Sequence, residues 1–199
     1  MKKKVGVFGG SFDPVHFGHL NLAVSLMERC ALDEVLFVPV SLSPFKENAP
    51  PVVSAEHRKE MLKLATHPVK QFLILDWEVH GQGPVYTIDT VRKLSADPSL
   101  QLHLILGEDH LVSFHHWKEA EELIRLAPPL IGTRGGGDLS QLPALFQEKL
   151  HEGRIRIPFF EISSTDVRDR LFQKKYCGHL VPATVLNYIE KHRLYFKVS

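Results

Sequence analysis

Residues 4–19 read Lys4-Val5-Gly6-Val7-Phe8-Gly9-Gly10-Ser11-Phe12-Asp13-Pro14-Val15-His16-Phe17-Gly18-His19. The run predicts a short apolar strand that ends in a glycine pair, followed by a turn at Asp13-Pro14. From Leu20 onward apolar residues recur at helical spacing, which places the two histidines at or near the N-terminal end of a helix. This order of elements favours an α/β fold with phosphate chemistry at the loop.

The loop has the chemistry to hold an anion. Glycine has no Cβ, so the backbone N–H groups after the strand can approach a phosphate closely, and the helix end carries partial positive charge. His16 and His19 lie three residues apart on one helical face and can stabilise charge that develops on a transferring phosphoryl group. The candidate phosphate-binding residues beside them are Gly9, Gly10, Ser11 and Phe12.

Each of these features also has an ordinary interpretation, since a histidine near a helix start is often a surface or capping residue. The strand is not followed by G-x-G-x-x-G, and no G-x-x-x-x-G-K-[ST] occurs anywhere in the chain. The sequence therefore supports neither a dinucleotide-binding oxidoreductase nor a P-loop NTPase.

A second segment near the C-terminus reads Ile162-Ser163-Ser164-Thr165-Asp166-Val167-Arg168. Its hydroxyl residues are N-cap types, and Asp166 three residues after Ser163 gives a pattern like a capping box, so a helix is expected to begin here. The first turn would offer N–H groups and hydroxyls to phosphate, and Arg168 would clamp oxygens with its planar guanidinium. The alternative is an ordinary helix cap.

The two segments together resemble the H-x-G-H nucleotidyltransferase superfamily. His16-Phe17-Gly18-His19 matches its first signature, and the run from Ile162 to Arg168 matches its second, I-S-S-T-x-x-R. The resemblance implies a Rossmann-like nucleotidyltransferase fold, with Ser163, Ser164 and Arg168 holding the nucleotide phosphates and the histidines stabilising the α-phosphate.

Composition is consistent with a compact enzyme. The chain has 199 residues, 44% of them hydrophobic, which predicts a single domain over residues 1–199 with a helical C-terminal portion from about residue 163. The net charge is +1, and the apolar runs are far shorter than the roughly 20 residues of a membrane span. We therefore expect a cytoplasmic protein with neither nucleic acid nor membrane as a partner, and two reduced cysteines.

Near-continuous apolar runs alternate with helical patterns along the rest of the chain, which is typical of a doubly wound, mostly parallel sheet. The strands are expected at 34–40, 71–76, 101–106, 130–133 and 154–160. The helices are expected at 55–66, 87–96, 117–126, 140–151, 163–174 and 182–193. Ligands of such sheets bind beyond the carboxyl ends of the strands, where both signature loops would fall.

Two internal segments resemble the bacterial nicotinate-nucleotide adenylyltransferases. Residues 84–90 are similar to P-S-Y-T-x-x-T, although Val85 replaces the serine, and residues 107–117 match G-x-D-x-L-x-x-F-x-x-W. The resemblance implies transfer of the adenylyl group of ATP to nicotinate mononucleotide. It implies an adenylyl-binding pair, Gly107 and Asp109, and nicotinate mononucleotide-binding residues Tyr86, Thr87, Trp117 and Arg134.

The same resemblance extends to Lys46, which would neutralise the triphosphate, and to Mg²⁺ that arrives with ATP. Phe45 replaces a family histidine, and Gly135-Gly136-Gly137 follow Arg134 where relatives have an R-P-G turn. His16 and His19 lack the glutamate of H-E-x-x-H, so no protein-bound metal is expected. Alternatives that remain are another phosphate ester as the acceptor, nicotinamide mononucleotide included, and a nucleotide-binding regulator without activity. The sequence does not decide the oligomeric state, and a homo-oligomer is among the alternatives.

Overall fold

The computed structural model describes residues 2–40, 51–77, 86–135, 138–158 and 160–196. The elements along the chain are β1 (Lys3–Gly10), α1 (Phe17–Arg29), β2 (Glu34–Pro39), α2 (Ala55–Thr66), β3 (Phe72–Ile74), α3 (Thr87–Ser95), β4 (Leu100–Gly107), the 3₁₀ helix η2 (Glu108–His116), α4 (Ala120–Leu126), β5 (Pro129–Thr133), α5 (Ala144–Glu152), β6 (Arg154–Arg156), α6 (Ser164–Phe172) and α7 (Ala183–Lys191).

The strands form one six-stranded sheet in the order β3-β2-β1-β4-β5-β6. β1 pairs with β4 in parallel, with Val5 beside Leu102, and β4 pairs in parallel with β5, which pairs in parallel with β6. The order reverses after β1, as in Rossmann-like folds. The predicted doubly wound α/β fold is therefore confirmed.

The chain forms two compact units. Unit 1 contains residues 1–9, 22–36 and 86–159, and unit 2 contains residues 10–21, 37–85 and 160–199. The sequence-based expectation that residues 1–199 form a single domain stays a prediction.

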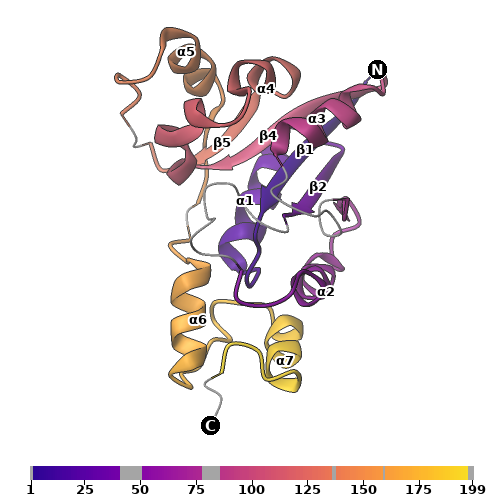
Figure 1. Ribbon diagram of the computed structural model, residues 1–199, viewed down its shortest axis with the longest axis vertical. Coiled ribbons are helices and arrows are strands. Elements are labelled where there is room, and N and C mark those ends of the chain that lie inside the picture. The colour runs from indigo at the N-terminus through magenta and orange to yellow at the C-terminus, as the bar shows by residue number, and fades with distance from the viewer. Residues whose placement is uncertain (1, 41–50, 78–85, 136–137, 159, 197–199) are drawn as a thin grey trace. The chain divides into compact units, whose positions relative to one another are not determined.

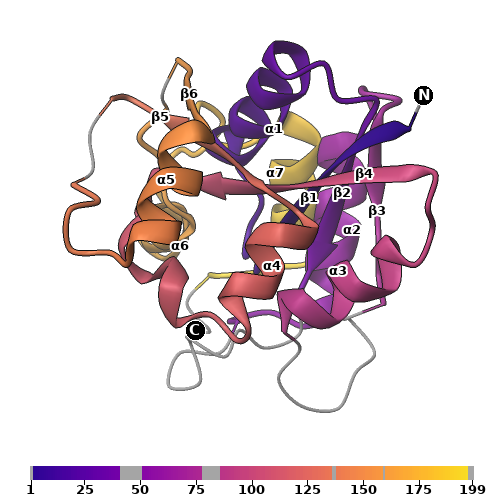
Figure 2. The same cartoon turned by 90° about the horizontal axis from the view of Figure 1, so that it is seen from above.

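Unit 1 is built on β4 and its neighbours. The alternating strand and helix patterns of this region become buried contacts, in which α3 packs against both α4 and β4 (Figure 2). The apolar runs of the strands supply the centre of the core, because both faces of a parallel strand are covered. Its buried residues include Val5, Val7, Ile88, Val91, Leu104, Ile105, Leu123 and Ile131.

Unit 2 carries α2, β3, α6, α7 and the loop between β1 and α1. α2 packs against both β3 and α7, and Figure 1 shows α2 beside α7. Its buried residues include Phe12, Val15, Phe37, Met61, Leu62, Val167, Leu171, Val185 and Ile189. The helical stripes read from the sequence supply most of this core.

Element boundaries differ most from the sequence-based expectation at three places. Residues 108–116 form η2, and α4 begins only at Ala120 after Glu119, whose φ of 51° interrupts the helix. α5 begins after Pro143, because proline cannot donate the backbone hydrogen bond of an earlier turn. β6 ends at Arg156, two residues before Pro158, which has no N–H for the ladder.

No helix within the described ranges has both the length and the apolar composition of a membrane span.

Candidate active site

The predicted site residues fall into two groups, each inside one unit. Unit 2 holds the two histidines and most of the predicted phosphate-binding residues, namely Gly10, Ser11, Phe12, His16, His19, Ser163, Ser164 and Arg168. Unit 1 holds Gly9, Tyr86, Thr87, Gly107, Asp109, Trp117 and Arg134. Lys46 and its neighbour Phe45 lie outside the described residues.

His16 and His19 form a stacked pair at the start of α1. Their ring centroids are 3.7 Å apart and the ring planes differ by 25°. The N–H of His16 donates to Nδ1 of His19 at 3.2 Å, and the N–H of His19 donates to Nδ1 of His16 at 3.4 Å. A ring nitrogen that accepts a hydrogen bond carries no proton, so each neutral imidazole holds its proton on Nε2. The pair can therefore present two Nε2–H donors.

His16 is buried, with 5% of its surface exposed. Burial lowers the pKa of His16 from 6.5 to about 4, because a charged imidazole loses its hydration there. His16 is therefore neutral at pH 7, where it can serve only as a neutral hydrogen-bond donor. A neutral donor aimed at developing negative charge needs no change of protonation during the reaction.

Two glycines of the first signature make room for aromatic rings. A Cβ on Gly18 would lie 3.0 Å from Cε1 and Nδ1 of the His16 ring and 3.4 Å from the carbonyl oxygen of Phe160. A Cβ on Gly10 would lie 3.0 Å from the ring of Phe12, which packs edge-on against His19 at 5.1 Å. A side chain at Gly18 would therefore be in tight contact with the His16 ring, and the ring would have to shift by a few tenths of an ångström to admit it.

The second signature caps α6 as its sequence predicts. The hydroxyl of Ser163 accepts the N–H of Asp166 at 3.1 Å and donates to Oδ2 of Asp166 at 2.6 Å. The capping interaction predicted from the sequence is confirmed, and it occupies the Ser163 side chain.

Two further side chains of this signature bind the histidine loop, which is residues 11–16 between β1 and α1. The hydroxyl of Ser164 donates to the carbonyl oxygen of Pro14 at 2.9 Å. The Arg168 guanidinium donates to the carbonyl oxygen of Asp13 at 2.7 Å and to Oγ1 of Thr165 at 3.1 Å. The two signatures are thus brought together within unit 2, and the second one positions the first.

Arg58 is a residue that the sequence analysis missed. It is 1% exposed, and its Nη1 donates to the carbonyl oxygens of Ser11 and Val40, both at 2.7 Å. Burial lowers the pKa of Arg58, and the charge of Asp13 opposes that shift. The available signal was its place in the helical pattern, because Arg58 shares the buried stripe of α2 with Met61, Leu62 and Ala65.

In unit 1, Gly107 and Asp109 follow the carboxyl end of β4. A Cβ on Gly107 would lie 2.4 Å from Oδ1 of Asp109, so the glycine lets this carboxylate fold back toward the strand end. The Asp109 side chain is 79% exposed, which leaves its oxygens accessible to hydroxyl donors. Gly9, at the end of β1, has open space at its Cβ position.

Tyr86 and Thr87 lie at the start of α3, and Lys118, the residue after Trp117, contacts the Tyr86 ring. The Tyr86 side chain makes no capping hydrogen bond at the start of α3, and the N-terminus of a helix is favourable for an anion. The Lys118 ammonium lies 4.3 Å above the Tyr86 ring and 3.5 Å from Oδ2 of Asp89. Trp117 is half-buried and packs against Phe114 with a centroid distance of 5.2 Å. It is therefore not a fully buried core residue.

Arg134 follows β5 and is exposed. Its N–H donates to Oε2 of Glu108 at 3.3 Å, while Oε1 of Glu108 accepts the Thr133 hydroxyl at 2.6 Å. Glu108, which the sequence analysis did not select, thus ties the end of β4 to the end of β5.

Comparison with known proteins agrees with both signatures. Residues 7–170 match the cytidylyltransferase-like family. Over its full length the chain is 39% identical to a probable nicotinate-nucleotide adenylyltransferase of Leifsonia xyli, covering 96% of that protein. It is 37% identical to the nicotinate-nucleotide adenylyltransferase of Bacillus subtilis, covering 97% of this chain and 98% of that one. The chain belongs to the nicotinate-nucleotide adenylyltransferase family.

A solved structure shares the fold of this adenylyltransferase family member. Plasmodium falciparum nicotinic acid mononucleotide adenylyltransferase, complexed with NaAD, superposes with a TM-score of 0.78 at 21% identity. The match covers 97% of each chain. The individual roles of the residues above remain predictions for this member of the nicotinate-nucleotide adenylyltransferase family.

Proposed function

We propose that this protein transfers the adenylyl group of ATP to nicotinate mononucleotide, giving nicotinate adenine dinucleotide and pyrophosphate. The reaction is a step of NAD biosynthesis. The observation that carries the proposal is the stacked pair of His16 and His19, held by Ser164 and Arg168 of the second signature. Relatives of 36% to 39% identity bear the name of this activity.

The chemistry is a direct displacement. An oxygen of the acceptor's 5′-phosphate attacks the α-phosphorus of ATP, and the bond from that phosphorus to the bridging oxygen of the β-phosphate breaks as pyrophosphate leaves. The two Nε2–H groups would donate to the α-phosphate as its charge rises, and no covalent intermediate on the protein is needed.

The phosphate tail of ATP would meet main-chain donors. The side chains of Ser163, Ser164 and Arg168 already bond within unit 2, and the Asp166 N–H is capped by Ser163, so the main-chain N–H groups of Ser164 and Thr165 at the start of α6 are the donors best suited to direct contact. Arg168 retains further N–H groups on its guanidinium and adds positive charge. Gly9, Gly10, Ser11, Phe12 and Lys46 keep their predicted contacts with the phosphates.

The acceptor would be selected in unit 1. The uncapped N-terminus of α3 at Tyr86 and Thr87 favours the negative carboxylate of nicotinate over a neutral carboxamide. Trp117 would stack on the pyridine ring, Asp109 would accept hydrogen bonds from the ribose hydroxyls of the adenylyl group, and Arg134 would contact nicotinate mononucleotide.

Mg²⁺ enters this proposal as part of the Mg-ATP substrate. Within the described ranges, histidine, cysteine, aspartate and glutamate side chains do not form a group of three or more that could hold a metal ion. The ion would neutralise the departing pyrophosphate. It stays a prediction that the protein is cytoplasmic and has neither nucleic acid nor a membrane as a partner. The sequence leaves the oligomeric state open, with a homo-oligomer among the alternatives.

The test measures pyrophosphate release from Mg-ATP with three acceptors offered separately: nicotinate mononucleotide, nicotinamide mononucleotide and phosphopantetheine. We expect a strong preference for nicotinate mononucleotide. Turnover with another acceptor alone would overturn the roles of Tyr86, Thr87 and Trp117. No turnover with any acceptor would favour a nucleotide-binding regulator.

A further inference from the structure

A buried carboxylate lies three residues before the histidine pair. Asp13 is 4% exposed, and a carboxylate without hydrogen bonds would be costly at such a site. Its Oδ2 accepts the N–H of Val52 at 2.7 Å, and its Oδ1 accepts the hydroxyl of Tyr195 at 2.7 Å. Each carboxylate oxygen therefore has a partner from a segment distant in the sequence.

Tyr195 is held in a demanding conformation near the end of the chain. Its φ is 65°, which is uncommon for a residue with a bulky side chain, and it is 9% exposed. Such backbone strain persists only where the surrounding contacts maintain it. Burial and the Asp13 carboxylate both raise the pKa of Tyr195, so the phenol stays protonated and donates the hydrogen bond.

Hydrogen bonds also hold the main chain of the same loop. Arg168 binds the carbonyl oxygen of Asp13, and its Nη1 lies 3.8 Å from Oδ2 of that residue. Ser164 binds the carbonyl oxygen of Pro14, and the N–H of Phe17 donates to the carbonyl oxygen of Leu180 at 2.9 Å. These contacts surround His16, so Tyr195 supplies one fixed point of a loop that is also held on both sides of the histidine.

We propose that Tyr195 is a positioning residue for adenylyl transfer, whose hydroxyl fixes the Asp13 carboxylate and thereby the loop that carries His16 and His19. This inference rests on the proposed function. Tyr195 touches no reacting atom in this scheme. Its effect is on the placement of the imidazole donors, where a displacement of about 1 Å costs up to 10²-fold in rate.

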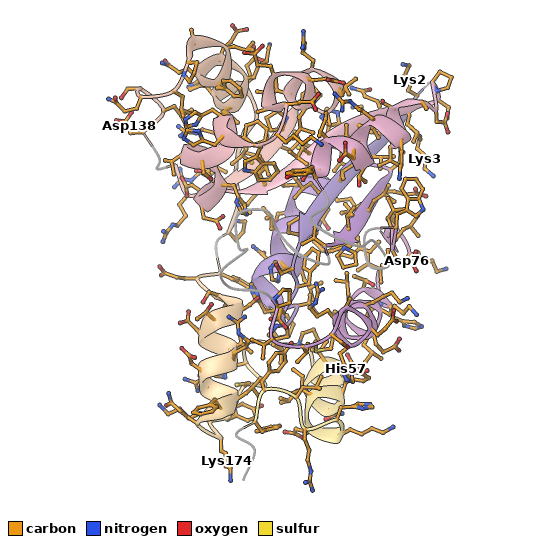
Figure 3. All side chains as sticks on the ribbon, in the orientation of Figure 1. Lys2, Lys3, His57, Asp76, Asp138 and Lys174 are labelled. Atoms are coloured by element: carbon orange, nitrogen blue, oxygen red, sulfur yellow. The ribbon has the colours of Figure 1, made fainter. Side chains whose placement is uncertain are left out.

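Tyr195→Phe removes only the hydroxyl, and Tyr188→Phe is the matched control. Tyr188 also lies in unit 2, and its hydroxyl bonds to Nδ1 of His57 at 2.9 Å, away from the loop. His57 lies on α2 in Figure 3, on the side toward α7. Each variant therefore loses one tyrosine hydroxyl with a hydrogen-bond partner in the same unit.

The first readout separates kcat from KM with Mg-ATP and nicotinate mononucleotide at temperatures well below both unfolding midpoints. We expect Tyr195→Phe to lower kcat about 10-fold, with the KM for ATP changed less than about threefold. Tyr188→Phe is expected to keep kcat within about twofold of the wild type. Equal kcat in both variants would overturn the proposal.

A second readout does not depend on turnover. In protein labelled with ¹⁵N-histidine, Tyr195→Phe is expected to shift the ring resonances of His16 and His19, and Tyr188→Phe to shift that of His57 instead. Unshifted His16 and His19 signals in Tyr195→Phe would overturn the positioning role. If the wild type turned over no acceptor, the proposed function would fail while this spectrum would still test the loop.

Asp13→Ala completes a double-mutant cycle, because alanine removes both oxygens that accept hydrogen bonds from Val52 and Tyr195. Tyr195 acts through Asp13 in this scheme, so adding Tyr195→Phe to Asp13→Ala is expected to cause less than a further twofold loss of kcat. A full 10-fold further loss would show that Tyr195 acts independently of Asp13 and would overturn the proposal. Should Asp13→Ala fail to fold, the Tyr195→Phe comparison still decides.

Discussion

The histidine loop of unit 2 and the α3 region of unit 1 are held by different kinds of interaction. In the loop, the buried Arg58 and the side chains of Ser164 and Arg168 donate to main-chain carbonyl oxygens. On α3, the partly exposed Arg92 pairs with Glu119 and Glu122, and Lys118 pairs with Asp89 of the same helix.

The difference implies that the histidine loop is held rigidly, whereas the contacts of the α3 region can adjust. A buried carbonyl that loses its donor finds no water to replace it, whereas exposed charges exchange their partners for water at little cost. We therefore expect changes around the loop to affect turnover and stability strongly. Changes beside α3 are expected to act mainly on the binding of the acceptor.

The largest expected effect is on the histidines themselves. His16→Ala and His19→Ala are each expected to lower kcat by about 10² to 10³, the scale of losing one transition-state donor. Steady-state pyrophosphate release measures the effect, with His67→Ala, on the exposed end of α2, as the control. Near-normal turnover of both variants would remove these histidines from the mechanism.

Replacement of the buried Arg58 is expected to have the next largest effect. Arg58→Met leaves two carbonyl oxygens without their donor and removes one of the two cations near the Asp13 carboxylate, so the free energy of unfolding is expected to fall by about 3 kcal/mol or more. Urea denaturation measures it.

Arg92→Met is the matched control for Arg58→Met. It removes an arginine whose ion pairs are partly exposed to water, and the urea midpoint is expected to stay close to that of the wild type. A similar loss of stability in the two variants would contradict the contrast between the buried loop and the exposed α3 region.

Acid is expected to weaken the fold through His16. Burial lowers the pKa of His16 from 6.5 to about 4, so between these values the unfolded chain binds a proton that the folded chain does not. The contribution of His16 to the free energy of unfolding is therefore fully present above pH 6.5. It is lost as the pH drops toward 4, and the whole loss is about 3 kcal/mol. Urea unfolding at pH 7 and pH 4.5 should show a smaller loss for His16→Gln than for the wild type. The same loss in both proteins would assign the acid sensitivity to other groups.

The smallest effect belongs to unit 1. Trp117→Ala is expected to raise the KM for nicotinate mononucleotide about 10-fold, because it removes one aromatic stacking surface, with the KM for ATP nearly unchanged. Initial rates at varied acceptor concentration measure the effect. Leu145→Ala is a control, because Leu145 is also partly exposed in unit 1 but lies on α5. A loss of kcat without a change in KM would place Trp117 in the transition state instead.

Much of the fold was predictable from local patterns. The helix expected at 55–66 is α2 with the same bounds, and the capping pattern at Ser163 is followed by α6. Periodicity and caps are local signals, so they identify elements well. The 3₁₀ helix η2 was missed, because its stretch carries no regular apolar period and the positive φ of Glu119 is not encoded by a glycine.

The candidate site was predictable in its residues but not in its contacts. Both signatures identified the histidines, Ser164 and Arg168, yet the sequence suggested only phosphate binding or an ordinary helix cap for the second signature, and no contact with the first. In the structure Ser164 and Arg168 bond to the histidine loop, so their hydroxyl and guanidinium groups position the donors. A capping pattern cannot show where the neighbouring side chains point.

The sequence by itself determined the order of strands and helices, the two signatures and, through them, the family. Only the tertiary structure decided that Asp13 would be bonded by Arg168 and Tyr195, which lie 155 and 182 residues further along the chain. No periodicity extends over such separations, because these bonds form only after the packed helices of unit 2 have removed water from the Asp13 carboxylate. The burial that makes the bonds strong is a property of the assembled unit.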